Sequence, residues 1–585
     1  MNATERRDQK NGQKLGSLKL FFQRLLGGAA AAKSAESADV GQERARSSHV
    51  PAADEAVAAG NAALSRREYR DAIDRFSAAI EARHDDAAAY CGLGMAHFKL
   101  GQREDAADNF QMALHFSADL VEPRYYLALL AQRAGDYPAA IDYATAALDR
   151  RPDHADACNL IGACALALGD AGRAVEFFAR AVELNPGEAR YQSNLGYVLV
   201  RDFGDVDRGR AYLETALRLD PADPATRCNY CSVLNQDGRT DEVISVCSEL
   251  LLQQPEMHEA RLNRALALLK KCRFAEGWQD YEARTATRSN YLPRPYKYAT
   301  WRGESLAGKT LLVYGEQGLG DEIMFASCLN GVIEQAARCI IDCSPKLETL
   351  FSRSFPSADV CGVEQAGGDA SRVKAHGQID FQIAAGSLPG LFRNSAQDFP
   401  VHNGYLRADR VRVDDWCRRL DADASRLKVG IAWRGGMTST RRKQRSLDLS
   451  QWLPILQLDR AVFVSLQHDA GAEEVAKVAA RESVALLHFP EVAADLDKAA
   501  ALISALDLVI TVCGSVVHLS GGLGRPAWVM VPAVAEWRYR DSGEIMPWYP
   551  SVRMFRQENA GDWNPVIAKI ASQLAHMAST GALRD

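Results

Sequence analysis

Small and large apolar residues recur at a fixed interval along the first half of the chain. A small residue returns every 34 positions, with one residue inserted before the sixth, at Gly60, Gly94, Ala128, Gly162, Gly196, Cys231 and Ala265. A second series combines small and large residues, at Ala72, Ala106, Ala140, Ala174, Phe76, Phe110 and Phe178. Prolines follow the second half of four successive units, at Pro152, Pro186, Pro221 and Pro255. The period predicts two paired helices per unit and about seven units over residues 55–288.

This pattern resembles the tetratricopeptide repeat, an α solenoid that curls into a superhelix with a concave groove. Grooves of this kind usually hold peptides or segments of other proteins, so the repeats predict a protein partner. A spacer or a self-association surface is the alternative. Cys228 and Cys231 lie inside the array without a second cysteine pair at zinc-ligand spacing, which favours core packing over metal binding.

The second half of the chain alternates short apolar runs with amphipathic stretches, the pattern of βαβ units and a largely parallel sheet. A proline-rich linker over 289–308 precedes two such sets, which predict subdomains at 309–412 and 413–585. The expected strands are 310–314, 339–342, 379–383, 427–433, 461–466, 484–487, 508–512 and 527–531. The expected fold is therefore an α solenoid followed by an α/β region of two Rossmann-like subdomains with a cleft between them.

Residues 1–54 are expected to form a basic tail. The first fifty residues hold nine Lys or Arg and five Asp or Glu, a net charge of 9 − 5 = +4. Apolar residues recur at helical spacing from Leu15 to Leu26, but Lys19, Gln23 and Arg24 interrupt them. This interruption argues against a secretory signal or a membrane span. A disordered extension is favoured, with a short amphipathic helix as the alternative.

Composition narrows the functional classes. The chain carries 69 Lys and Arg against 75 Asp and Glu, a formal net charge of −6. This balance lacks the basic surplus that neutralises a row of phosphates, so no nucleic-acid partner is predicted. The 13 cysteines are scattered over a long chain and do not look like a disulfide framework. We expect a cytoplasmic protein without stable membrane insertion.

A glycine-rich turn, Gly315 to Glu322, follows the first expected strand of the α/β half and leads into a helix predicted over 323–337. Such a turn brings backbone N–H groups close to an anion. Asp342, after the second strand, lies where a dinucleotide-binding fold places its ribose acid, so an NAD-dependent enzyme is a rival hypothesis. The G-x-x-G-x-G order of the glycines and a stronger anion-binding signature downstream count against it.

The stronger signature covers residues 507–526, a strand, a tight turn and a helix followed by another turn and strand. Backbone N–H groups and the helix dipole at the start of this helix attract phosphate. A basic run at 441–445 follows the strand 427–433 and offers guanidinium groups suited to phosphate oxygens; a solvated loop is the alternative. The candidate anion-binding residues are Arg434, Gly435, Lys443, Arg445, Gln467, Gly514, Ser515, Val516 and His518.

Four short segments of the chain are together similar to a known architecture, at 277–284, 315–322, 515–519 and 547–553. With the repeats, they resemble bacterial tetratricopeptide proteins fused to a heptosyltransferase-like GT-B glycosyltransferase. The resemblance implies inverting transfer of a sugar from a nucleotide donor, without a metal or other cofactor. Architectures of this kind include soluble flagellin glycosyltransferases, which implies flagellin as a first acceptor. Cys513 and Gly514 depart from the pattern, because heptosyltransferase-like proteins often carry Asp-Thr there.

An inverting transfer needs a base at the acceptor hydroxyl and groups that stabilise the departing phosphate. Asp321 resembles the base of heptosyltransferases. An acid at a helix N-terminus is stabilised as an anion and becomes a weaker base, so a structural helix-starting carboxylate is the alternative. Glu316 and Glu322 are the substitutes. The candidate anion-binding residues then become the donor-binding set, and the aromatic segment 537–549 either caps the donor or anchors the fold.

The leading hypothesis is a glycosyltransferase that modifies a Ser or Thr of a protein captured by the repeats. A lipid-linked saccharide acceptor is a second hypothesis, with the basic tail on the membrane. The third is a non-catalytic adaptor whose GT-B half has decayed. None of the three Asp-x-Asp sequences follows an apolar strand, and neither a Gly-x-Ser-x-Gly elbow nor a Walker loop occurs. Metal-bridged transfer, hydrolysis by a serine nucleophile and NTPase activity are therefore not predicted.

Overall fold

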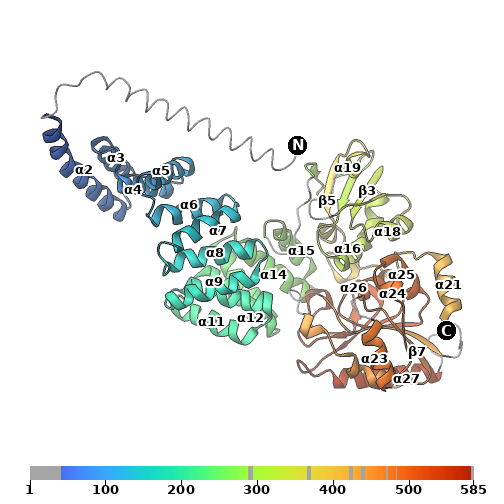
Figure 1. Cartoon of the computed structure of the whole chain (residues 1–585). Coiled ribbons are helices and arrows are strands. Elements are labelled where there is room, and N and C mark those ends of the chain that lie inside the picture. The colour runs from blue at the N-terminus through green and yellow to red at the C-terminus, as the bar shows by residue number, and fades with distance from the viewer. Residues whose placement is uncertain are drawn as a thin grey trace. The chain divides into compact units, whose positions relative to one another are not determined.

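The computed structural model describes residues 41–287, 294, 296–364, 371–420, 426–436, 442–468, 472–482 and 484–580. The chain divides into two compact units, residues 1–184 and 185–585 (Figure 1). Within the described residues, no helix is long and apolar enough to cross a lipid bilayer. The 13 cysteines of the chain are all free.

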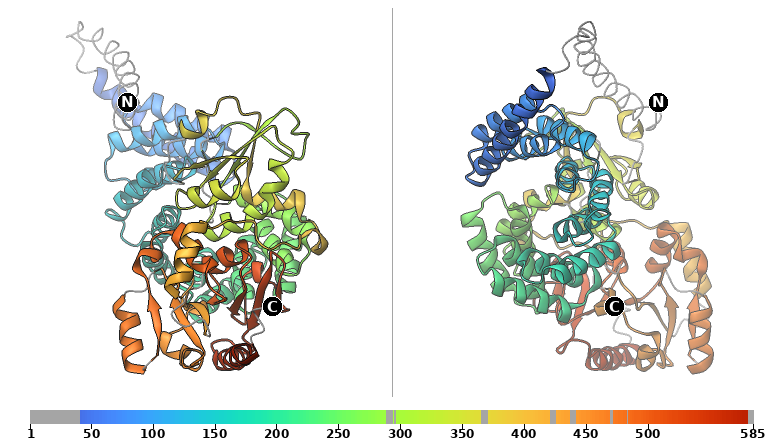
Figure 2. Two further views of the ribbon diagram at one scale, coloured as in Figure 1. Left: turned by 90° about the vertical axis from the view of Figure 1, so that its right-hand side faces the viewer. Right: turned by 60° about the vertical axis from the view of Figure 1, so that its left-hand side comes forward.

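The first unit is a stack of antiparallel helix pairs (Figure 2). The helices are α2 (Gly41–Ser65), α3 (Tyr69–Ala82), α4 (Ala87–Lys99), α5 (Arg103–Phe116), α6 (Glu122–Arg133), α7 (Tyr137–Leu148), α8 (Ala155–Ala167) and α9 (Ala171–Leu184). The start of α2 at Gly41 corrects the predicted tail, whose residues 41–54 are helical. Residues 1–40, with the apolar run from Leu15 to Leu26, lie outside the described part.

The contact between the two helices of a pair explains the 34-residue period. A Cβ atom at Gly60, Gly94 or Gly162 would lie 2.7 Å from the ring of the phenylalanine sixteen residues later, Phe76, Phe110 or Phe178. These rings are buried. The glycine therefore lets the two helices approach closely while the phenylalanine fills the space between them, because interiors are packed to near crystal density.

Replacing Gly162 by alanine is expected to destabilise the protein by about 1 kcal/mol. Overpacking against Phe178 costs about 1–3 kcal/mol, and the better helix propensity of alanine offsets only about 1 kcal/mol of it. Gly172→Ala in α9 is the matched control, because its Cβ would lie 3.7 Å from the nearest atom, Oδ1 of Asp170. Urea unfolding measures both; equal stabilities for the two variants would contradict this packing.

The second unit begins with three more helix pairs. They are formed by α10 (Ala189–Val198), α11 (Val206–Leu219), α12 (Pro224–Gln236), α13 (Thr240–Gln253), α14 (His258–Lys270) and α15 (Phe274–Tyr281). The one-residue insertion predicted between Gly196 and Cys231 is absorbed by η1 (Leu199–Phe203), a π-helical turn. A π turn accommodates one extra residue without breaking the helix. Cys228 and Cys231 are buried in α12, as expected for packing residues.

Two sheets follow, each the centre of one lobe. The first lobe contains β1 (Ala299–Thr300), β2 (Thr310–Tyr314), β3 (Arg338–Cys343), β4 (Asp359–Gly362) and β5 (Phe381–Ala384). Their order is β1-β5-β2-β3-β4, and all neighbours are parallel. The helices after β2 and β3 are α16 (Leu319–Phe325), α17 (Leu329–Ile333) and α18 (Glu348–Ser354), with short helices α19 (Ser371–Lys374) and α20 (Pro389–Phe392) further along.

The second lobe has a seven-stranded sheet. Its strands are β6 (Leu427–Ala432), β7 (Ala461–Ser465), β8 (Leu486–His488), β9 (Leu508–Val512), β10 (Ala527–Val531), β11 (Ile545–Met546) and β12 (Tyr549–Arg556). The order β11-β12-β10-β9-β6-β7-β8 is parallel except for β11. Its helices are α21 (Arg410–Leu420), α22 (Leu453–Leu456), α23 (Ala472–Glu482), α24 (Pro490–Ala493), α25 (Leu496–Ser504), α26 (Ser515–Gly522) and α27 (Asn564–Thr580). From β8 to β12 the order is that of a doubly wound nucleotide-binding sheet.

Several predicted boundaries are wrong. The region 289–308 is not a linker: Arg294 and Tyr296 are buried, and β1 pairs with β5. The predicted subdomain boundary at 412/413 falls inside α21, which packs against α25 of the second lobe. The helix predicted over 323–337 starts at Leu319 and is broken after Phe325. Strands β4 and β12 are not among the predicted strands, because their polar and aromatic residues obscure the apolar pattern.

Candidate functional site

The second sheet reverses its strand order between β6 and β9, which are hydrogen-bonded neighbours. In doubly wound sheets, ligands bind at this switch point, beyond the carboxyl ends of the strands. The loops that follow β6 and β9 touch there. A Cβ atom at Gly435 would lie 2.1 Å from the carbonyl oxygen of Cys513, so only glycine allows this approach.

Helix α26 starts at this switch point. Gly514 has an extended backbone and precedes Ser515, the first residue of the helix. As a glycine, Gly514 has no side chain that could cap this helix N-terminus. Four of the predicted residues, Gly435, Gly514, Ser515 and Val516, are therefore adjacent at the carboxyl edge of the sheet, where backbone N–H groups can bind an anion.

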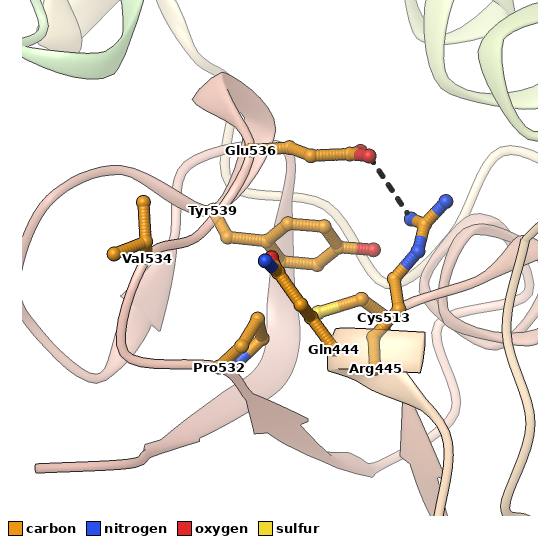
Figure 3. A pocket seen from close by; sticks show the side chains of 7 residues that line it. All are labelled: Gln444, Arg445, Cys513, Pro532, Val534, Glu536 and Tyr539. Atoms are coloured by element: carbon orange, nitrogen blue, oxygen red, sulfur yellow. Dashed lines mark ion pairs between the residues drawn. The ribbon is translucent and has the colours of Figure 1, made fainter. Parts of the chain in front are cut away.

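A small pocket adjoins the switch point (Figure 3). Arg445, the last residue of the 3₁₀-helix η8 (Arg442–Arg445), lies against it with only 9% of its side chain exposed. The residues that line the pocket are Gln444, Arg445, Cys513, Pro532, Val534, Glu536 and Tyr539. Burial raises the pKa of the Cys513 thiol to about 12, so this thiol is uncharged at physiological pH.

Four charged side chains form a chain of ion pairs across the two lobes, which we call the interlobe charge chain: Arg445, Glu536, Arg538 and Asp321. Nη1 of Arg445 lies 3.2 Å from Oε1 of Glu536. Nη1 of Arg538 lies 3.4 Å from Oε2 of the same glutamate. Nε of Arg538 donates to Oδ1 of Asp321 at 2.8 Å, and Nη2 donates to the same oxygen. The predicted base is thus held by an arginine of the opposite lobe.

His518 lies beside the interlobe charge chain and is 5% exposed. Its Nδ1 is 3.0 Å from the hydroxyl of Tyr549, and its ring packs against Gly320 of α16. Burial, together with the charges of Arg538 and Arg445, lowers the pKa of His518 to about 3. The imidazole is therefore neutral at physiological pH, and it can donate one hydrogen bond but carries no charge.

The lowered pKa of His518 predicts a pH-dependent loss of stability. An unfolded histidine has a pKa of about 6.5, so between about pH 6.5 and 3 the unfolded chain binds more protons, and stability falls as the pH falls. From pH 7 to pH 5 this amounts to about 2 kcal/mol. Asp342 acts in the opposite direction, because burial raises its pKa to about 6.

Urea unfolding of the wild type and of His518→Gln at pH 7 and pH 5 isolates the histidine, since Asp342 is common to both. We expect the wild type to lose about 2 kcal/mol more than the variant over this interval. Parallel losses in the two proteins would show that His518 protonates equally well in the folded state.

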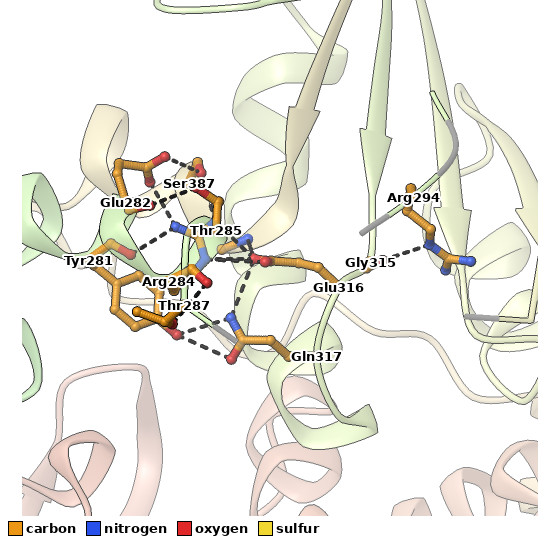
Figure 4. A network of polar contacts seen from close by, with 11 residues as sticks. Tyr281, Glu282, Arg284, Thr285, Thr287, Arg294, Gly315, Glu316, Gln317 and Ser387 are labelled. Carbon is orange, nitrogen blue, oxygen red and sulfur yellow. Dashed lines mark hydrogen bonds and ion pairs between the residues drawn. The ribbon is translucent and has the colours of Figure 1, made fainter. Parts of the chain in front are cut away.

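The switch point of the first sheet, between β2 and β5, is filled by the protein itself. Figure 4 shows Glu316, in the loop after β2, facing Arg284 of η2 (Glu282–Thr285). Nε and Nη2 of Arg284 donate to Oε1 of Glu316 at 3.1 and 2.9 Å, and the N–H of Gly386 after β5 donates to the same oxygen. Both side chains are nearly fully buried. A buried ion pair of the protein therefore occupies this switch point.

The proposed substitutes for the base are structural. Glu316 is held by Arg284, and the buried Glu322 accepts the N–H of Ser344 through Oε2 at 2.8 Å. The NAD hypothesis fails at Asp342. That carboxylate is buried, ion-paired with Arg294 at 3.1 Å and hydrogen-bonded to the hydroxyl of Tyr296, so it is not available to a ribose.

Three predicted donor-binding residues have other roles or lie outside the described part. The guanidinium of Arg434 pairs with both carboxylate oxygens of Glu474 on α23, each at 2.7 Å. Gln467 is buried and clamps the loop after β6, because its Oε1 accepts the N–H groups of Trp433 and Arg434. Both side chains thus make contacts within their own lobe, and their assignment to donor binding stays a prediction. The side chain of Lys443 is outside the described residues.

The aromatic segment 537–549 anchors the fold rather than capping a ligand. Trp537 and Trp548 are buried and pack edge-on against Trp278 of α15. Nearby, Asp541 forms ion pairs with two lysines at the end of the repeats. Its Oδ1 lies 3.0 Å from Nζ of Lys270, and its Oδ2 lies 3.3 Å from Nζ of Lys271. The last repeat helices and the loop that carries Glu536 and Arg538 thus form one packed structure.

Sequence reasoning missed Arg538, Glu536 and Arg284. Arg538 stands between Trp537 and Tyr539 in 3₁₀-helix η10 (Trp537–Tyr539), inside a segment whose sequence pattern is dominated by aromatic residues. Its position after β10, at the same edge as the other loops, is the signal that could have found it. In the described part of the chain, no group of three or more His, Cys, Asp or Glu side chains could hold a metal ion.

Comparison with known proteins bears on both halves. Residues 57–120, 125–189 and 189–223 match the tetratricopeptide-repeat family, which confirms the predicted repeats. Protein FlbA of Caulobacter vibrioides is 28% identical over 526 residues, 88% of this chain and 82% of FlbA.

Two solved structures show a weaker likeness. Pseudomonas aeruginosa PilF is 15% identical with a TM-score of 0.33, and covers 36% of this chain and 96% of its own. YrrB, described as a tetratricopeptide-repeat protein with an unusual peptide-binding site, is 22% identical with a TM-score of 0.25, over 28% of this chain and 86% of its own. TM-scores this low say nothing further about this chain. Tetratricopeptide repeats generally bind peptides or proteins.

Proposed function

We propose that this chain is a GT-B glycosyltransferase that moves a sugar from a nucleotide donor to a Ser or Thr hydroxyl of a protein recruited by its repeats. The observation that carries the proposal is the convergence, at the carboxyl edges of two parallel sheets, of Asp321 from one lobe with Arg538, Arg445 and His518 from the other. Arginines and a helix N-terminus can hold a phosphate leaving group without a metal.

Each group has a defined task in this proposal. Arg445 and the N–H groups at the start of α26 hold the donor phosphate, and the neutral His518 donates a hydrogen bond to it. Asp321 takes the proton of the acceptor hydroxyl, as the resemblance to heptosyltransferases implies. Negative charge develops on the departing nucleotide and must be stabilised. Hydrogen-bond donors that are already in position, in a site with little water, stabilise this charge most effectively.

The repeats supply the acceptor. Tetratricopeptide arrays bind peptides or proteins, and here their last helices are packed against the loop at 536–541 that borders the pocket. Flagellin is the first acceptor to test, because the resembling architectures include flagellin glycosyltransferases. The cytoplasm, where nucleotide sugars and unassembled acceptor meet, is the proposed location.

Intact-mass spectrometry of flagellin from cells with and without this gene tests the proposal. Loss of a mass equal to one or more sugar residues upon deletion, and its return upon complementation, is the expected result. An unchanged flagellin mass would remove flagellin as the acceptor. Incubation of the purified chain with nucleotide sugars then tests the enzyme class itself, through donor turnover.

A non-catalytic adaptor is the second candidate, favoured by the ion pairs that the protein makes within its own site. Arg434 is held by Glu474, and Asp321 by Arg538. An adaptor with a decayed donor site would bind no nucleotide sugar at all. Calorimetric titration with nucleotide sugars therefore separates the two candidates, since the transferase must bind its donor.

A further inference from the structure

Arg538 occupies a central position in the interlobe charge chain. Its side chain is 16% exposed and its guanidinium stacks over the ring of Trp537 at 4.7 Å. Nη1 of Arg538 contacts Glu536, on the same loop. Nε and Nη2 donate to Oδ1 of Asp321 in the other lobe. Two cations and two carboxylates alternate along the interlobe charge chain, so the net charge of these four described groups is zero.

Arg538 lies close to the N-terminus of α26. Its partner Asp321 follows Gly320, where a Cβ atom would lie 2.9 Å from the ring of His518 and 3.7 Å from Cα of Ser515. Arg445 belongs to the same group, because Glu536 contacts both arginines, and the charges of both lower the pKa of His518. Planar guanidinium groups match phosphate oxygens in geometry as well as in charge.

We propose, on the basis of the proposed function, that Arg538 is a ligand of the donor phosphate. In the absence of the donor, the carboxylate of Asp321 occupies the position of this phosphate on Arg538. Of the two carboxylates that contact Arg538, Asp321 is the one that can be displaced. Glu536 is two residues from Arg538 on the same loop and moves with it, and it also pairs with Arg445. Asp321 belongs to the other lobe and makes the interlobe contact.

The exchange links donor binding to activation of the base. While Arg538 donates two N–H groups to Oδ1 of Asp321, this oxygen is occupied and is not available to the acceptor hydroxyl. When the donor phosphate takes Arg538, the carboxylate is released. The acceptor oxygen then bonds to the anomeric carbon as its proton passes to Asp321, and the bond from that carbon to the phosphate oxygen breaks with its electron pair leaving on the nucleotide.

Two opposite effects on nucleotide affinity follow. Arg538→Gln removes a charged donor to the phosphate and is expected to weaken binding about tenfold or more. Asp321→Asn removes the competing carboxylate and is expected to tighten binding about threefold to tenfold, while it abolishes sugar transfer. Tighter binding by Asp321→Asn cannot arise from misfolding, which protects the test against a poorly folded Arg538 variant.

Isothermal titration of the full chain with UDP, GDP, dTDP, ADP and CMP identifies the tightest of these probes, which is then used for each variant. Arg553→Gln is the matched control, since Arg553 pairs with Glu544 on the same lobe with 43% of its side chain exposed. Its affinity is expected to equal that of the wild type.

The outcomes separate the two proposals. Weaker binding by Arg538→Gln together with tighter binding by Asp321→Asn supports the inference. Unchanged or weaker binding by Asp321→Asn, in a protein whose wild type binds a nucleotide, overturns the inference and leaves the glycosyltransferase proposal intact. If no probe binds to the wild type or to either variant, the proposed function fails and the inference fails with it.

Discussion

Replacing Arg284 by methionine is expected to lower the free energy of unfolding of the second unit by about 3–5 kcal/mol. Arg284 is 3% exposed and its carboxylate partner, Glu316, is 1% exposed. Burial alone disfavours the charged arginine, yet Glu316, Glu282 and Tyr281 together outweigh that penalty, and the pKa of Arg284 is raised. Without the arginine, the buried glutamate loses its compensating partner, and this is what destabilises the fold.

Two further variants make this result specific. Arg273→Met breaks an exposed pair with Glu276 in α15 and is expected to cost about 0–1 kcal/mol. The double variant Arg284→Met, Glu316→Gln removes both charges and is expected to recover part of the loss, because replacing a whole buried pair is far cheaper than breaking it. Denaturant unfolding followed by tryptophan fluorescence measures all of them. A cost for Arg284→Met no larger than that of Arg273→Met would contradict the proposed role.

Replacing Arg445 by alanine is expected to lower the rate constant of sugar transfer by about 10² to 10³ while the protein remains folded. Arg445 is the described cation nearest the pocket at the switch point, and its side chain is almost completely shielded from water. A charge in such a position contributes most when negative charge develops on the departing phosphate, so kcat falls more than KM rises.

Arg460→Ala is the control for this experiment. Arg460 is exposed and immediately precedes β7, at the amino edge of the same sheet and so away from the switch point. Steady-state donor turnover with saturating acceptor is the measurement. Equal rate constants for Arg445→Ala and Arg460→Ala would exclude Arg445 from the transfer step.

The fold could be predicted well where one local rule repeats. The glycine and phenylalanine positions of the first unit revealed the helix pairs, because each pair buries the same contact. The apolar strands β2, β6, β9 and β10 were identified from their hydrophobic runs, since strands covered on both faces need no polar alternation. The switch-point loops at Gly435 and Gly514 followed from the strand-turn-helix pattern.

The partners of the charged residues could not be predicted. Arg434 and Arg445 belong to the same stretch of sequence, yet one pairs with Glu474 on α23 and the other with Glu536 after β10. Arg294 looked like part of a linker, although its guanidinium is buried against Asp342. Such pairings depend on segments far apart in the chain, and hydrophobic periodicity carries no information about them.

Hydrogen exchange with and without the tightest-binding nucleoside phosphate tests whether the donor binds at the switch point of the second sheet. We expect slower exchange in the loop at 433–436 and at the start of α26, residues 514–518. We also expect no change in helices α4 to α9 or in the first-lobe turn at 315–318, where Glu316 already occupies the switch point. Protection confined to residues 315–318, with none at α26, would contradict donor binding at the switch point of the second sheet.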